Sequence, residues 1–220
     1  MNEHRQEFDR QLEDIEAKVI ELFAMVAEDL PKATDALLTG DSQTVTVLAE
    51  RERAIDALYP EIEELASREI LLQAPVATDL RFLLTVLRIV PEIERSHDLV
   101  MQIASQGSHM LNADLSPRVD GLIRRMGELV VGMWRQAADA WYQRDRTVAR
   151  TLTENDDDLD ALYASLIAEL ASGQLALPVT MEITLAGHDY ERLGAHAVNI
   201  ARRVMYLAGT TPPRTEQGDS

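Results

Sequence analysis

The sequence contains no cysteine among its 220 residues. This absence excludes a disulfide framework and any thiolate metal site. Aromatic residues make up only 5% of the chain, so a core drawn from its 46% of hydrophobic residues must be largely aliphatic. Only 10 glycines and 8 prolines are present, and their scarcity favours long helices over a turn-rich β-sandwich. The length suffices for one large domain or two small ones.

Two further absences concern location. No run of about 18 apolar residues occurs, so we expect no membrane-spanning helix and no direct insertion into a membrane. The first ten residues, MNEHRQEFDR, are highly charged and do not resemble a secretory signal. We therefore expect a cytoplasmic protein.

Positive charge is scarce as well. The chain has 21 Lys and Arg against 38 Asp and Glu, a formal net charge of −17. A field of that sign repels phosphate backbones and anionic lipids, so we expect no nucleic-acid partner. It favours the capture of cations. An acidic surface also simply keeps a protein soluble, and this second explanation stays open.

Apolar residues recur at steps of three and four near the start of the chain, which predicts an amphipathic helix. Pro31 interrupts the pattern and should kink this helix, because proline lacks a backbone N–H donor. Gly40 and Asp41 fit the end of one helix and the N-cap of the next. The stripe consists of Phe8, Leu12, Ile15, Val19, Leu22, Val26 and Leu30.

Two more helices are expected before the middle of the chain. The second should extend to about Leu72, and the third should start near Pro75. Pro91 either bends this third helix or marks a later start. The polar, turn-rich segment 105–118 then forms the one substantial linker.

The second half of the sequence repeats the first. The letters DALY at 56–59 recur at 160–163, an offset of 104 (160 − 56) that also relates other matched residues. In the third helix the offset falls to 97 (191 − 94). We therefore predict an all-α fold of two tandem three-helix bundles that share one core. The predicted repeats are residues 1–108 and 115–209, followed by a disordered tail at 210–220.

Acidic pairs four residues apart recur at equivalent positions of the repeats. Such pairs lie on one helix face, where like charges destabilise a helix by a few tenths of a kcal/mol. If the second and third helices of each repeat are antiparallel neighbours, the pairs converge, and oxygen ligands suit hard cations such as Mg, Ca, Mn or iron. Ala195 leaves the last pair incomplete. The candidate metal ligands are Glu52, Asp56, Glu94, Asp98, Asp156, Asp160 and Glu191.

Two alternatives compete with such a metal site. The acidic pairs could be solvated surface residues, with Arg51, Arg53 and Arg95 near enough for weak ion pairs. Alternatively, Glu94 and His97 have the Glu-x-x-His spacing of ferritin-like di-iron oxidases. That class needs two such pairs, and only one is present in this register. No glycine-rich phosphate loop, nucleophile elbow or His-Glu-x-x-His motif occurs.

The segments that carry these pairs resemble the PhoU family of phosphate-signalling regulators. The resemblance extends over about residues 5–210 and is most specific in PVATDLR (75–81), in DALY and in the closing ARRVMYLAGTTP. It implies two three-helix bundles, a homodimer in many members and no enzymatic activity. It also implies negative regulation of the phosphate-starvation response, by linking the ATPase subunit of a phosphate ABC transporter to a sensor histidine kinase.

The resemblance also implies a role for the acidic pairs. Some members bind multinuclear metal clusters with an acidic residue followed four positions later by Asp. This pattern falls on Glu52 with Asp56, on Glu94 with Asp98 and on Asp156 with Asp160. The chain departs from the pattern at Ala195, where the family usually has Asp, and at His97, where it usually has Gly. We therefore expect the first repeat to be the favoured metal site.

Overall fold

The computed structural model describes residues 2–110, 114–145 and 147–208. These residues form six α-helices and no strand, which confirms the predicted all-α pair of three-helix bundles. The predicted disordered tail at 210–220 lies outside the described residues. The helices are α1 (Asn2–Thr39), α2 (Ser42–Gln73), α3 (Ala77–His109), α4 (Pro117–Gln143), α5 (Val148–Leu170) and α6 (Leu177–Ala208).

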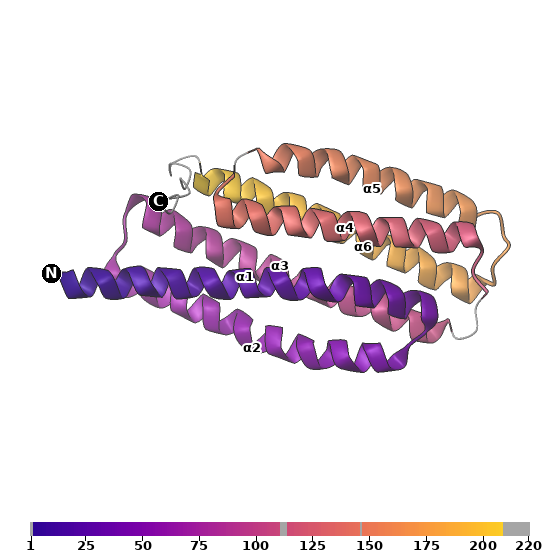
Figure 1. Ribbon diagram of the computed structural model, residues 1–220, viewed down its shortest axis with the longest axis horizontal. Coiled ribbons are helices and arrows are strands. Elements are labelled where there is room, and N and C mark those ends of the chain that lie inside the picture. Colours follow the sequence, from indigo (N-terminus) through magenta and orange to yellow (C-terminus); the bar gives the residue numbers. More distant parts are fainter. Residues whose placement is uncertain (1, 111–113, 146, 209–220) are drawn as a thin grey trace, which may run out of the picture.

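Four of the helices surround a shared centre. α1 packs on α3, α3 on α6, α6 on α4 and α4 on α1, so each repeat contributes two helices to one central bundle. α2 packs only on α1 and α3, and α5 only on α4 and α6, as far as the described residues show. Figure 1 shows these two helices on opposite sides of the molecule. The acidic pairs of α2 and α5 therefore lie on the flanking helices.

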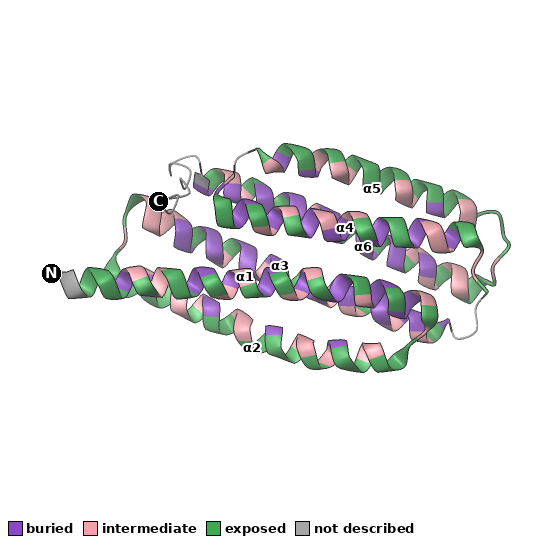
Figure 2. Cartoon of the chain, in the orientation of Figure 1, coloured by how far each residue is buried: buried purple, intermediate pink, exposed green. Residues whose placement is uncertain are grey.

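A single hydrophobic core connects the repeats, as the sequence predicts. Buried residues line the inward faces of all six helices, whereas the outer faces of α2 and α5 are mostly exposed (Figure 2). Trp134 and Trp141 of α4 are fully buried. The ring of Trp141 stacks on Phe82 of α3 at 5.5 Å, and Phe23 of α1 lies 6.0 Å from Trp134. Aromatic contacts thus join the two repeats across the core.

The helix ends follow local sequence rules. Gly40 ends α1 with a φ of 70°, and the Asp41 carboxylate accepts a 2.9 Å hydrogen bond from the Gln43 amide, as expected for an N-cap. Arg144 occupies the equivalent place after α4, with a φ of 56° that is unfavourable for a residue with a side chain. Its guanidinium binds the Glu16 carboxylate and lies 4.2 Å from the Trp141 ring centre. These contacts offset the backbone strain.

Pro31 and Pro91 do not end their helices. α1 continues through Pro31 to Thr39, and α3 begins at Ala77, so Pro91 lies inside a long helix and does not mark a late start. α2 ends at Gln73, where Ala74 adopts a left-handed conformation with a φ of 43°. The polar segment after residue 105 is partly helical, because α3 extends to His109.

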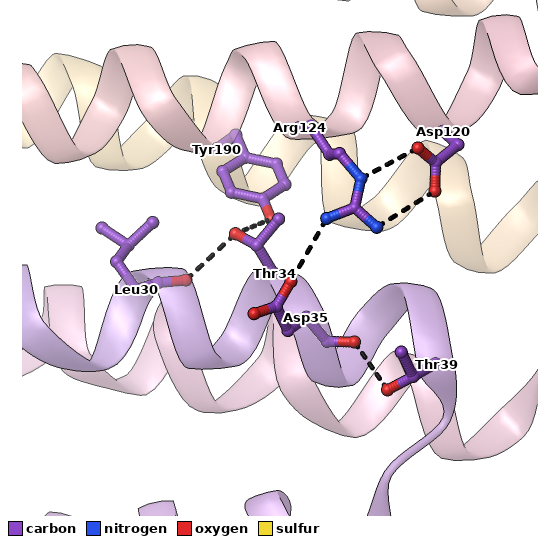
Figure 3. A network of polar contacts seen from close by, with 7 residues as sticks. All are labelled: Leu30, Thr34, Asp35, Thr39, Asp120, Arg124 and Tyr190. Atoms are coloured by element: carbon purple, nitrogen blue, oxygen red, sulfur yellow. Dashed lines mark hydrogen bonds and ion pairs between the residues drawn. The ribbon is translucent and has the colours of Figure 1, made fainter.

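Polar contacts also join the repeats, as Figure 3 shows. The hydroxyls of Thr34 in α1 and Tyr190 in α6 lie 2.7 Å apart, and both residues are buried. Arg124 of α4 binds Asp35 of α1 at 3.3 Å and Asp120 of its own helix at 2.9 Å. A methyl group on Gly127 would lie 2.7 Å from the Thr34 hydroxyl oxygen, so glycine permits this close approach.

Gly107 supports the most sensitive contact between α3 and α1. A Cβ atom there would lie 2.2 Å from the Ala36 carbonyl oxygen, which is backbone and cannot rotate away. We predict that Gly107→Ala lowers the free energy of unfolding by about 1–3 kcal/mol, because the two helices must separate. The control is Gly132→Ala in α4, which meets no atom within 4 Å and should stabilise by about 0.5–1 kcal/mol. Urea titration followed by circular dichroism measures both; equal effects would contradict this packing.

Candidate functional site

The first repeat brings its two acidic pairs to facing sides of α2 and α3. Burial is the largest cause that raises the pKa values of Glu52, Glu94 and Asp98. The charges of Asp98, Asp56 and Glu52 raise the pKa of Glu94 further, and those of Asp98 and Asp56 do the same for Glu52. Carboxylates from both helices therefore repel one another across the contact. This excess of negative charge is what a bound cation would neutralise.

The second repeat has a smaller version of the same arrangement. Burial raises the pKa values of Asp156 and Asp160 on α5, and the charge of Glu191 on α6 contributes to both shifts. The charge of Arg202 acts in the opposite direction on Asp156. Glu191 also has a partner of its own, because its Oε2 lies 3.1 Å from Nδ1 of His188. Ala195 adds no fourth carboxylate to the candidate ligands, although the charge of Asp157 also raises the pKa values of Asp156 and Asp160.

The donor set fits a hard cation in kind, since every candidate ligand offers carboxylate oxygen. Within the parts of the chain that the structure describes, however, no three Asp, Glu or His side chains are gathered closely enough to hold an ion as they stand. Binding would require side-chain rotation of the partly exposed carboxylates. Metal binding at these seven residues therefore stays a prediction.

His97 points to a different partner from the one its Glu-x-x-His spacing suggests. Its Nε2 lies 3.2 Å from Oδ2 of Asp29, and the two residues are 1% and 0% exposed. Nζ of Lys32 donates to Oδ1 of Asp29 at 2.8 Å. Nε of Arg51 lies 3.1 Å from Oδ2 of Asp29. Asp29 on α1 therefore engages Nε2 of the imidazole, while His97 remains close enough to Glu52 and Asp98 to act electrostatically on both.

Asp29 is ionised in spite of its burial. Desolvation raises its pKa, but the hydrogen bonds from His97 and Lys32 and the charge of Arg51 together outweigh that effect, so the pKa is lowered. Arg51 also pairs with Glu28 at the surface. The network thus connects α1, α2 and α3 directly behind the first acidic group.

The second repeat replaces this network by apolar packing. Met133 occupies the position of Asp29, at the offset of 104, and Gly194 occupies that of His97, at the offset of 97. A Cβ atom on Gly194 would lie 2.5 Å from Leu159 Cδ2, 3.2 Å from Asp156 Oδ1 and 3.4 Å from Met133 Cε, so a side chain there would require these neighbours to move. Both positions differ together between the repeats, which is the pattern expected of two residues in contact.

Sequence reasoning did not identify Asp29. The signal was available, because Asp29 lies on the apolar stripe of α1, three residues after Val26 and four before Ala33. A charged residue at a core position of a helix requires a buried partner. The other histidine near the acidic residues, His196, is bound to the Ser96 hydroxyl at 2.8 Å, and burial lowers its pKa. It therefore belongs to the contact between α3 and α6.

We predict that Asp29→Met lowers the free energy of unfolding by about 3 kcal/mol, because it leaves His97 buried without a partner. Adding His97→Gly installs the pair found in the second repeat, so the double variant should lose less than the sum of the single losses, by about 1 kcal/mol or more. Chemical denaturation at neutral pH measures this coupling. As a control, Asp14→Met, at an exposed carboxylate of α1, should change stability by less than about 0.5 kcal/mol. Strictly additive losses would contradict the pairing.

Comparisons with known proteins agree with this architecture. The family model described as "PhoU domain" matches residues 19–106 and 123–204. The chain is 28% identical to a phosphate-specific transport system accessory protein PhoU homolog of Pseudomonas aeruginosa, over 95% of this chain and 88% of that protein. It is 30% identical to the homolog of the same name in Zymomonas mobilis, over 96% and 91%.

Solved structures show the same fold. The crystal structure of PhoU from Pseudomonas aeruginosa superposes with a TM-score of 0.86 at 27% identity, covering 93% of this chain and all of that one. The phosphate transport system regulatory protein PhoU of Streptococcus pneumoniae has a TM-score of 0.83 at 24% identity, covering 91% and 96%. With two matched domain copies and relatives over nearly its whole length, the chain belongs to the PhoU family.

Proposed function

We propose that this protein is a non-enzymatic accessory regulator of phosphate transport. The observation that carries the proposal is the similarity along nearly the entire chain to relatives named as accessory proteins of the phosphate-specific transport system. Both repeats and the linker region are included, so the relation is not confined to one shared module. The protein would act through contacts between its helices and partner proteins.

The finer proposal is that the protein represses the phosphate-starvation response when phosphate is plentiful. It would do so in the cytoplasm, as a homodimer, by binding the ATPase subunit of a phosphate ABC transporter and a sensor histidine kinase. Among the described residues, no helix is long and apolar enough to cross a membrane, so both partners would be reached from outside the bilayer. The exposed outer faces of α2 and α5 offer two long helical surfaces for such contacts (Figure 2).

We further propose that divalent or iron-type cations brace α2 against α3, and α5 against α6 more weakly. The support is the convergence of Glu52, Asp56, Glu94 and Asp98, whose mutual repulsion a cation would remove. In the second repeat the candidate ligands are Asp156, Asp160 and Glu191, and the charge of the neighbouring Asp157 also raises the pKa values of Asp156 and Asp160. A bound ion would hold the flanking helix in one position and so fix the surface that a partner contacts.

The regulatory role is tested by deleting the gene and measuring a starvation-responsive reporter in high phosphate. We expect the reporter to become active, because the restraint on the kinase is lost, and to be repressed again when the wild-type gene is restored. The Gly132→Ala variant serves as a matched complementation control, since its added methyl group meets no neighbouring atom. Unchanged repression in the deletion strain would overturn the proposed role.

Metal loading is tested by elemental analysis of the purified protein. We expect Asp98→Ala to remove most of the bound metal, and Ala195→Asp to increase loading of the second repeat by supplying the missing carboxylate. Glu64→Ala, at an exposed position on α2, is the control and should change nothing. Because the pKa values of Glu52, Glu94 and Asp98 are raised, protons compete for these oxygens and loading should fall as the pH is lowered towards them. Equal metal occupancy of both repeats in the native protein would contradict the predicted preference.

A further inference from the structure

A groove between α3 and α6 gathers positive charge on this acidic protein. Its volume is about 260 Å³, and three of its six lining residues are arginines, while none is acidic. The chain as a whole has 21 Lys and Arg against 38 Asp and Glu, so the groove has the opposite sign of charge from the protein. The groove lies between the N-terminal half of α3 and the C-terminal half of α6. The lining residues are Thr85, Arg88, Asn199, Arg202, Arg203 and Tyr206.

The arginine charges are only partly compensated. Arg88 and Arg202 are exposed and have no ion pair within 4 Å in the part of the chain that the structure describes. Arg202 does act at longer range on Asp156 of α5. Burial raises the pKa of Asp156, and the positive charge of Arg202 reduces that increase. Nε of Arg203 lies 3.7 Å from the Glu92 carboxylate and is buried without a hydrogen-bond partner. Glu92 therefore offsets the charge of Arg203 only, and Arg88 and Arg202 have no carboxylate within 4 Å among the described residues.

Glu92 itself is already engaged. Its Oε1 accepts a hydrogen bond of 3.2 Å from the Asn199 amide. The Thr85 hydroxyl donates to the Arg81 carbonyl oxygen of its own helix, so it is not free as a donor. The remaining donors that face the groove are the three guanidinium groups and the Tyr206 hydroxyl. Each of these groups can donate hydrogen bonds to an anion.

The internal repeat shows that the fold does not require these arginines. At the offset of 97, Glu92 corresponds to Asp189 and Arg203 to Gln106, and these two counterparts also pair, with Gln106 Nε2 donating to Asp189 at 3.1 Å. A neutral glutamine thus makes the equivalent contact between α6 and α3. Arg88 and Arg202 correspond to Leu185 and Ser105. The three positive charges are therefore an addition on one side of the molecule only.

We propose that this groove binds an anion of the phosphate class, either free inorganic phosphate or a phosphate group attached to another molecule. Guanidinium groups match the oxygens of such anions with paired hydrogen bonds, and three of them suit its charge of about −1.5 to −2. The volume holds one phosphate group with a few waters, at about 30 Å³ for each water, and not a long polyanion.

The overall charge of −17 does not prevent such binding. Ions screen charges beyond about 8 Å at physiological ionic strength, so the adjacent arginines determine the local potential. The same net charge disfavours long polyanions, whose many phosphates would lie against acidic surface. The groove therefore selects a small phosphate group in preference to a nucleic acid. This inference does not rest on the proposed regulatory role, because it concerns binding to the isolated protein.

Isothermal titration calorimetry of the full-length protein with inorganic phosphate, phosphoserine and sulfate tests the proposal. We expect saturable binding of at least one phosphate compound, and comparable binding of sulfate, because the groove offers hydrogen-bond donors to a tetrahedral oxyanion. Tighter binding of inorganic phosphate identifies a free anion as the ligand, and tighter binding of phosphoserine identifies an attached phosphate; either supports the proposal. The variant Arg88→Gln/Arg202→Gln should bind about tenfold more weakly or worse. Both side chains are exposed, so the variant should keep its melting temperature within a few degrees.

The matched control removes the same two charges elsewhere. Arg10→Gln/Arg150→Gln changes exposed arginines of α1 and α5 and should bind phosphate as the wild type does. The proposal is overturned if neither phosphate compound binds at millimolar concentration, or if both double variants bind equally. Binding of an acidic, unphosphorylated peptide in preference to phosphoserine would also overturn it.

Discussion

The antiparallel contact between α3 and α6 is the constraint on which the rest of the structure depends. Each of these helices is the inner wall of its own repeat and also the surface through which the repeats join. Ser96 with His196, Glu92 with Asn199 and Gln106 with Asp189 pair along it. α3 and α6 are packed on both sides, by each other and by the helices of their own repeats. α2 and α5 lie on the outside of this arrangement and are packed on one side only. Their outer faces remain exposed for partners (Figure 2).

The two repeats share a backbone but fill it differently. The first buries the hydrogen-bonded pair Asp29 and His97, where the second packs Met133 against Gly194. Asp29 also pairs with Lys32 and Arg51. A buried charged network is often no more stabilising than apolar packing of similar volume, so stability alone does not explain it. The network lies close to the first acidic group, since His97 acts electrostatically on Glu52 and Asp98.

Charge is distributed unequally across the same helices. The acidic pairs occupy the contacts of the inner helices with α2 and α5, whereas the arginine groove lies along the contact of α3 with α6. Arg202 is near both, since its charge reaches Asp156. An anion bound in the groove would reduce that influence and so favour the protonated form of Asp156 or a cation beside it. The proposed anion and cation sites are thus electrostatically coupled in the second repeat.

The sequence alone determined the helices, the duplication and the chemical type of the acidic groups. These follow from the spacing of apolar residues and from local caps such as Gly40 and Asp41, which depend on neighbours in the chain. Only the tertiary structure decided what faces what. It assigned His97 to Asp29 and His196 to Ser96, and it brought Arg88 beside Arg202, which is more than 100 positions away. Such pairings depend on how helices cross, because a helical pattern fixes which face is buried but not which partner covers it.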